Sequence, residues 1–595
     1  MVAHRVAYLL RVARINPKAI LVLCFNRSAI LTLRQRLRDL VGDDMAGVTL
    51  LTFHGLALRL TGRSLVTQAK QGRRKEIDFS EVITEAIRLL QGKSEVMGLQ
   101  DIPPDVALVG RFSHILVDEY QDIDAEQYEL VSLVAGKSRE ESDRKLAIFA
   151  VGDDDQNIYR FRGASVAFIR QFQQDYSADV YSLIENYRST AHIIAAANCL
   201  IAHNTDRMKT STPIRVNKAR QNLPPGGNWQ VNDPVTRGKV QILEVADPGA
   251  QATVVLGELQ RLQRAGLVES NRCAILAREW KDLDIVRSVC EKSGVPVSVC
   301  WGRHSSFPRL SSIEENANLL DQLRTMQTET CSGGNLLAML EHMAPVQTVW
   351  RENLHRLLLD WMEETNNVPQ PVPAIQEYLY EVLAEQGRTK SMGNGLVLAT
   401  AHAVKGLEFD HVFILGDSWR GGDQPTLEDE RRLYYVAMSR ARETLHLFLL
   451  DSAAHPHLSL LQGDFLMRRR PSVSSVANGP FHSYHLLGLE DFYLDFLGRK
   501  PEQHPSRLAG HQVKAGSVVQ IELRNGHLEL VNRDGVAFAR LSRKAQAKWM
   551  PRLGAMQEIR IVALARRSKD EIVDKALQAR CKGTSWHVPI VEVVC

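Results

Sequence analysis

Cysteine is scarce and scattered in this sequence. The eight cysteines among 595 residues include no C-x-x-C pair, which excludes the usual spacing of a structural zinc site or an iron–sulfur cluster and favours a reducing compartment. A signal-peptide pattern is absent from the N-terminus, and no apolar run is long enough to span a bilayer. These absences predict a cytoplasmic protein.

A strong net charge is absent as well. The formal charge is +4, and a composition of 44% hydrophobic and 24% charged residues is typical of ordinary globular chains. A chain of 595 residues is too long for one core, so three or four domains are expected. The charge is uneven, because residues 502–595 hold sixteen Lys and Arg against nine Asp and Glu. This basic tail predicts either a nucleic-acid surface or a solvated face.

The most informative stretch runs from His114 to Asp122. Its apolar residues 115–117 predict a buried strand of a parallel sheet, with Asp118 and Glu119 at the carboxyl end. Open α/β sheets bind ligands at that edge. One carboxylate could hold the Mg²⁺ of a bound nucleotide while the other orients a water molecule for attack. Taken alone, the pair could equally be an acidic loop after a core strand.

Two earlier apolar runs, residues 19–25 and 48–53, predict further strands, and each ends in phenylalanine followed by a polar residue. The four residues at these ends are Phe25, Asn26, Phe53 and His54. Aromatic residues in such places are usually part of a core. At the carboxyl edge of a parallel sheet they can also stack on single-stranded bases.

The loop after the strand predicted at 145–152 is dense in polar groups and aromatic rings. Gln156 could sense a terminal phosphate, and Tyr159, Phe161 and Arg162 offer flat faces for bases. An acidic turn with a buried tyrosine and phenylalanine is the structural alternative, although it leaves so many polar groups unexplained.

A domain junction is expected near Tyr187 and Arg188, whose ring and guanidinium could stack on a nucleobase and reach a phosphate. Asn525-Gly526 between two alternating runs predicts a β-hairpin near the end of the chain. The expected organisation is an α/β domain at 1–178 with a small helical insertion at 61–109, a second α/β domain at 179–299 and 391–452, a helical subdomain inserted at 300–390, a linker at 453–479 and a basic β-rich domain at 480–595.

Seven blocks, taken in order, resemble the UvrD/Rep/PcrA group of superfamily 1 DNA helicases. They lie at residues 24–29, 52–55, 118–122, 151–164, 186–189, 402–409 and 433–441. Each block is weakly specific, but all seven in one order indicate the family as far as about Asp451. Phe161 stands where the family commonly has tryptophan, which keeps a stacking face but makes it smaller.

The resemblance implies two RecA-like α/β domains, ATP with Mg²⁺ in the cleft between them, and movement along single-stranded DNA from 3′ to 5′. The implied partners are single-stranded and partly duplex DNA, with no membrane. By position it assigns Asp118 to Mg²⁺, Glu119 to the attacking water, Gln156 to the γ-phosphate, Tyr187 to adenine, Glu408 to the ribose, and Arg188 and Arg440 to the transferred phosphoryl group. The implied single-strand track comprises Phe25, Asn26, Phe53, His54, Tyr159, Phe161, Arg162 and His402.

Members of this family carry a P-loop, G-x-x-x-x-G-K-[ST], before their first helix, and the 595 residues contain no such motif. We therefore expect a chain truncated just after the P-loop, which hydrolyses no ATP unless another polypeptide supplies that loop. One alternative is a DNA-binding module that no longer hydrolyses ATP. A helicase–nuclease is a weaker alternative, because no acidic metal-ligand cluster is visible after residue 480.

Overall fold

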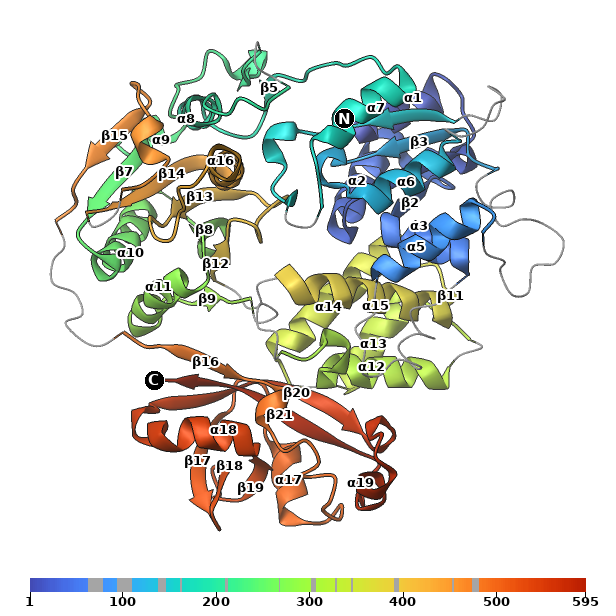
Figure 1. The fold of residues 1–595 in the computed structure, drawn as a ribbon, viewed down its shortest axis with the longest axis vertical. Helices are drawn as coiled ribbons and strands as arrows, with labels where there is room; N and C mark the ends of the chain where they lie inside the picture. The colour runs from blue at the N-terminus through green and yellow to red at the C-terminus, as the bar shows by residue number, and fades with distance from the viewer. Residues whose placement is uncertain are drawn as a thin grey trace. The chain divides into compact units, whose positions relative to one another are not determined.

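The computed structural model describes residues 1–62, 79–93, 110–136, 146–160, 163–208, 212–266, 268–300, 307–326, 329–343, 346–389, 395–451, 454–472 and 481–595. These residues form two compact units, whose elements are labelled in Figure 1. The first unit contains the described residues of 1–283 and 399–474, and the second contains those of 284–398 and 475–595. None of the described helices is both long and apolar enough to cross a membrane.

The first sheet is parallel, and its strands run in the order β2-β1-β3-β4. They are β2 (Thr49–Thr52), β1 (Ile20–Cys24), β3 (His114–Val117) and β4 (Ala147–Ala150), as the sequence predicts. Alternate side chains of β1 enter two cores, one on each face of the sheet. One core is shared with α1 (Val2–Arg11) and α2 (Arg27–Val41), the other with α3 (Phe53–Thr61), α5 (Phe79–Leu90) and α6 (Ala125–Val134). The rest of the insertion predicted at 61–109 lies largely outside the described residues.

The second sheet is also parallel, and within the first unit its strands run in the order β15-β7-β14-β13-β8. They are β15 (Leu466–Arg469), β7 (Val240–Val245), β14 (Ala441–Leu450), β13 (Phe409–Ile414) and β8 (Cys273–Ala277). β12 (Leu396–Thr400) pairs in parallel with β9 (Val297–Ser298). The helices of this domain include α8 (Ala191–Ile201), α10 (Pro248–Ala265) and α16 (Gln424–Met438).

β15 lies within the stretch 453–479, which the sequence predicts to be a linker. Leu466 to Arg469 pair in parallel with β7, from Leu466 opposite Val240 to Arg469 opposite Leu243. Arg469 also donates to the side chain of Gln241 and forms an ion pair with Glu258 at 2.5 Å. Two of the four residues of the strand are arginines, which donate to groups on neighbouring elements. The sequence therefore has no apolar run here that would predict a strand.

The second unit combines a helical part with a six-stranded antiparallel sheet. The helices are α12 (Glu314–Thr325), α13 (Gly333–Met343), α14 (Val349–Glu364) and α15 (Val372–Thr389). The sheet has the order β16-β21-β20-β17-β18-β19, formed by β16 (Tyr484–Leu487), β21 (Ser585–Val594), β20 (Glu558–Ser568), β17 (Val518–Arg524), β18 (His527–Val531) and β19 (Ala537–Arg540). The buried indole N–H of Trp350 in α14 donates to the carbonyl of Val562 in β20 at 2.7 Å, so the two parts share an interior.

The hairpin predicted at Asn525-Gly526 is present. Arg524 pairs with His527, and both turn residues have positive φ, 49° at Asn525 and 76° at Gly526. That is the backbone of the two-residue turn that joins twisted antiparallel strands. The β-rich character predicted for the end of the chain is therefore confirmed.

Candidate nucleotide site and DNA-contacting surface

The carboxylate pair sits on a tight turn directly after β3. The Asp118 N–H still donates to Leu23 of β1, at 2.9 Å, whereas the Tyr120 N–H donates to Val151 beyond β4, also at 2.9 Å. Between them Glu119 adopts a left-handed conformation, with φ 52°, which costs a non-glycine residue on the order of 1 kcal/mol or more. This turn ends the strand abruptly and leaves both carboxylates at the carboxyl edge of the sheet.

Asp118 is in an environment that disfavours its negative charge. Burial, and then the neighbouring charge of Glu119, raise the pKa of Asp118 to about 6. A divalent cation bound between the two groups would relieve both effects, since it restores the solvation that burial removes and neutralises the repulsion. The donor set of two carboxylates suits Mg²⁺.

Gln156 connects this edge to the loop after β4. It ends a short 3₁₀ helix, Asp154–Gln156, and its amide donates to Asp153 at 2.8 Å. Gln121 fixes the two loops against each other, because its side chain accepts from the Asp153 N–H and its carbonyl accepts from Asn157. A Cβ at Gly152 would lie 2.8 Å from the Gln121 side-chain oxygen, so a larger residue there would displace that oxygen from its place between the loops.

Two arginines of the second α/β domain lie close to each other, and one of them contacts the Gln156 loop. Arg440, 2% exposed, follows α16 and donates to the Gln156 side-chain oxygen at 3.2 Å. Arg188 forms an ion pair with Glu408 at 2.5 Å and donates to the Ser439 carbonyl at 3.2 Å. Burial, and then the charge of Arg188, lower the pKa of Arg440 to about 10. Two close cations in this setting favour an anion between them.

Tyr187 differs from its neighbours in that its side chain is open to solvent. The residue is 71% exposed, and its hydroxyl donates to Glu185 at 3.3 Å. A free aromatic face beside Arg188 suits stacking on a planar base.

Two of the residues predicted to contact DNA, Phe25 and Tyr159, form an aromatic pair. The rings of Phe25 and Tyr159 stack with centroids 5.6 Å apart and planes 17° apart. Both side chains are half-buried, as are His54 and His402, whereas the Asn26 side chain accepts from the Ala29 N–H as the cap of α2. Phe161 and Arg162, predicted as part of the same track, lie outside the described residues.

Phe53 does not fit the stacking role predicted for it. Its ring is 1% exposed and packs in the core on one face of the first sheet, together with Leu21 and Leu56. α3 begins at Phe53, directly after β2, so the side chain turns inward rather than toward the sheet edge. We therefore assign Phe53 to the core.

Lys405 and Asp122 form a contact between the two α/β domains that the sequence does not single out. The Lys405 ammonium lies 2.6 Å from an Asp122 carboxylate oxygen and donates to the Gln156 carbonyl at 2.6 Å. It also lies 5.2 Å from the centre of the Tyr159 ring. Burial raises the pKa of Asp122 to about 7, with Lys405 opposing the shift. One lysine thus touches the loop of the carboxylate pair, the Gln156 loop and the aromatic pair.

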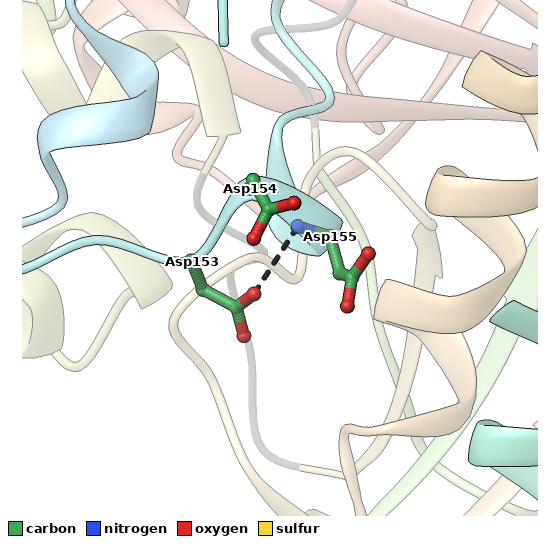
Figure 2. A group of neighbouring side chains, drawn as sticks. All are labelled: Asp153, Asp154 and Asp155. Atoms are coloured by element: carbon green, nitrogen blue, oxygen red, sulfur yellow. Dashed lines mark hydrogen bonds between the residues drawn. The ribbon is translucent and has the colours of Figure 1, made fainter. Parts of the chain in front are cut away.

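Three consecutive acids, Asp153, Asp154 and Asp155, gather their carboxylates within 4.8 Å of one another and are drawn in Figure 2. Their oxygens are already engaged. Asp155 accepts two hydrogen bonds from Arg207, each 2.7 Å, Asp154 accepts from the Met208 N–H at 2.6 Å, and Asp153 accepts from the Asp155 N–H at 3.1 Å. These contacts tie the loop to residues 207–208 of the second domain, and we assign the acids to that role rather than to a metal.

The fold and these contacts define a class of protein in which two RecA-like α/β domains face each other, one carrying acids and the other arginines. The UvrD/REP helicase N-terminal domain model matches residues 1–71 and 66–177, and the UvrD-like helicase C-terminal domain model matches residues 181–311 and 317–452. Together they cover most of the chain. The chain belongs to the UvrD/REP helicase family, whose members are enzymes.

Individual relatives agree with this assignment. The ATP-dependent DNA helicase PcrA of Staphylococcus epidermidis is 24% identical over 609 residues, covering 75% of this chain and 79% of that protein. PcrA of Staphylococcus aureus is 24% identical over 612 residues, with the same shares covered. A solved structure, the C-terminal domain of a possible DNA helicase from Lactobacillus, covers 48% of this chain and 98% of that chain at 14% identity, with a TM-score of 0.23. That likeness is too weak to support a conclusion.

Proposed function

We propose that this protein is an ATP-dependent DNA helicase that moves along single-stranded DNA from 3′ to 5′. The observation that carries the proposal is the reach of Arg440, with Arg188 beside it, from the second RecA-like domain to Gln156 in the first. A site divided in this way binds its nucleotide differently when the domains approach or separate. Such a difference is what couples a nucleotide cycle to stepping.

The residues present fit a nucleotide with Mg²⁺. Burial and then repulsion by Glu119 raise the pKa of Asp118, while burial and then repulsion by Arg188 lower the pKa of Arg440. A bound Mg²⁺–triphosphate would place a cation near the first pair and an anion near the second, and it would supply the bond to be hydrolysed. In this proposal Asp118 holds the metal, Glu119 orients water, Gln156 and the two arginines contact the terminal phosphate, and Glu408 contacts the ribose. Tyr187 stacks on the base.

Single-stranded DNA would cross the stacked rings of Phe25 and Tyr159, and His54 and His402 would belong to the same track. Stacking on aromatic rings holds bases without regard to sequence, which a translocating enzyme needs. Lys405, in contact with both the Tyr159 ring and the Gln156 carbonyl, links this surface to the nucleotide site.

We further propose that residues 1–595 hydrolyse no ATP by themselves, because they contain no P-loop to cradle the phosphates. β4 ends the described four-strand sheet, and Ile148, Phe149 and Ala150 on it stay partly exposed, whereas every residue of β1 is buried. The outer edge of β4 is therefore a place where another strand can pair.

The test is phosphate release stimulated by single-stranded DNA. The 595-residue chain should release no phosphate above background, and a chain extended at its N-terminus by a family-like strand and P-loop should turn over. Glu119→Gln in the extended chain should abolish turnover, while Asp39→Asn, an exposed acid of α2 in the same domain, should leave it unchanged. Turnover by the unextended chain that Glu119→Gln abolishes would overturn the P-loop proposal. Turnover in the extended Glu119→Gln chain would overturn the role of Glu119.

A further inference from the structure

The basic surplus of the C-terminal domain is concentrated on one element. Residues 535–557 contain five Lys and Arg and no Asp or Glu. One of the five, Arg540, is neutralised by Glu529 at 2.7 Å. The other four belong to α18 (Arg543–Trp549) and the 3₁₀ segment Met550–Ala555 that follows it.

α18 has two opposite faces. Ala545 and Trp549, both 1% exposed, pack into the core of the six-stranded sheet. Arg543, Lys544 and Lys548 are exposed on the other side, and Arg552 is exposed one turn farther on. We call these four side chains the α18 basic face.

The cations of the α18 basic face have no ionic partner in residues 481–595 or elsewhere in the described chain. Basic residues on the neighbouring strands are paired instead, for example Arg560 with Glu558 at 2.5 Å and Arg567 with Asp495 at 3.1 Å. The nearby acid Asp491 accepts from the Gly488 N–H at 2.9 Å; burial raises its pKa, and Lys548 and Lys544 oppose that shift without forming an ion pair with it. After burial, Lys548 and Arg552 are the next causes that lower the pKa of His485, so their positive field reaches their neighbours.

We propose that the α18 basic face binds the phosphate backbone of duplex DNA without regard to sequence. Four unpaired cations on one exposed face complement a row of phosphates. The face lacks the aromatic rings on which single-stranded bases stack, because Phe481, 37% exposed, is the one exposed Phe, Tyr or Trp in residues 481–595 and Trp549 is buried. Bases stacked inside a duplex need no such rings. The inference rests on the proposed function only in taking DNA as the partner.

The proposal predicts a distinct salt dependence. Each phosphate contact on a duplex contributes about 0.9 to the slope of log affinity against log salt, so four contacts contribute between three and four. Those contacts alone should account for a change in affinity on the order of a hundredfold between 50 and 200 mM salt. The measurement is the anisotropy of a labelled blunt duplex titrated with the full chain across that range.

The test variant is Arg543→Gln/Lys544→Gln/Lys548→Gln/Arg552→Gln, whose four sites are all exposed. It should keep the melting temperature of the wild type and lose about three units of salt slope. The matched control is Lys575→Gln/Arg580→Gln/Lys582→Gln, three exposed cations of the same domain that lie in a segment also containing Asp570, Glu571 and Asp574. The control should lose about one unit of slope at most.

An unchanged salt slope in the fourfold variant would overturn the proposal. The α18 basic face would then be better suited to an acidic protein partner. Equal losses in both variants would also overturn it, since the general charge of the domain would then explain binding. A single-stranded oligonucleotide separates this inference from the proposed function. A chain that binds single strands but no duplex overturns the α18 basic face alone, whereas a chain that binds duplex but no single strand overturns the proposed track at Phe25 and Tyr159.

Discussion

Replacing Lys405 by methionine tests whether the two RecA-like domains are joined through a buried charge. The Lys405 side chain is 8% exposed and that of Asp122 is 1% exposed, so the substitution leaves the acid without its counter-charge. Breaking a buried pair by removing one partner costs on the order of 3–5 kcal/mol when the remaining group stays charged. Asp122 has an alternative, because its pKa is already raised to about 7 and loss of Lys405 raises it further.

The sign of the pH dependence follows from that pKa. In Lys405→Met the folded protein keeps the Asp122 proton at pH values where the unfolded chain has lost it. The folded state then binds more protons, so stability falls as pH rises, by up to about 1.4 kcal/mol per pH unit. In the wild type this loss is confined to pH values below about 7, because above the folded pKa Asp122 is ionised in both states.

The assay is urea unfolding at pH 6, 7, 8 and 9, followed by circular dichroism. The difference between wild type and Lys405→Met should widen from pH 7 to 9. Asp122→Asn/Lys405→Met should remove the widening, because no proton is then bound at position 122. Lys281→Met, which removes an exposed partner of Glu279, is the matched control and should cost less than about 1 kcal/mol at every pH. If the stability of the wild type and of Lys405→Met changes equally between pH 7 and 9, Asp122 does not bind a proton in the variant.

Two other predictions follow from the described side chains. Tyr159→Ala should weaken single-strand binding by about tenfold or more, since a base–aromatic stack contributes roughly 1–3 kcal/mol. Tyr8→Ala, which changes an exposed tyrosine of α1, should leave that binding unchanged. Equal affinities of the wild type and Tyr159→Ala in a fluorescence titration would contradict the proposed DNA track. Burial lowers the pKa of His455 to about 4 and of His457 to about 3, so their neutral forms stabilise the fold fully above pH 6.5 and progressively less as pH falls toward 4. His457→Phe should flatten the loss of stability between pH 6.5 and 4, and an unchanged profile would show that other groups govern acid unfolding.

Strands and turns with strong local signals could be predicted from the sequence. β3 could be predicted because three apolar residues precede two acids, and the hairpin at Asn525 could be predicted because its turn needs positive φ. β15 could not, because its pairing with β7 depends on acceptors for Arg469 supplied by distant residues. The strand propensity of these four residues is too weak to predict a strand that depends on contacts with distant residues.

In the candidate site, too, local motifs could be predicted from the sequence but contacts between distant residues could not. The blocks at 118–122 and 402–409 could be located from sequence, but the contact between their members Asp122 and Lys405 joins residues 283 positions apart and requires coordinates. Phe53 shows that two residues with the same sequence pattern can have different surroundings. The pattern of a strand ending in phenylalanine is the same at Phe25 and Phe53, yet α3 begins at Phe53 itself while α2 begins two residues after Phe25, so one ring is buried and the other is half-exposed.

ATP-dependent movement from 3′ to 5′ can be measured as the unwinding of partial duplexes that carry a single-stranded tail on either end. The chain extended by a P-loop should separate the 3′-tailed duplex in the presence of ATP and Mg²⁺ and leave the 5′-tailed duplex intact. Arg440→Gln should slow this unwinding by on the order of a thousandfold or more, as loss of an arginine at a transferred phosphoryl group does. Unwinding that prefers the 5′ tail, proceeds without ATP or survives Arg440→Gln would contradict the account.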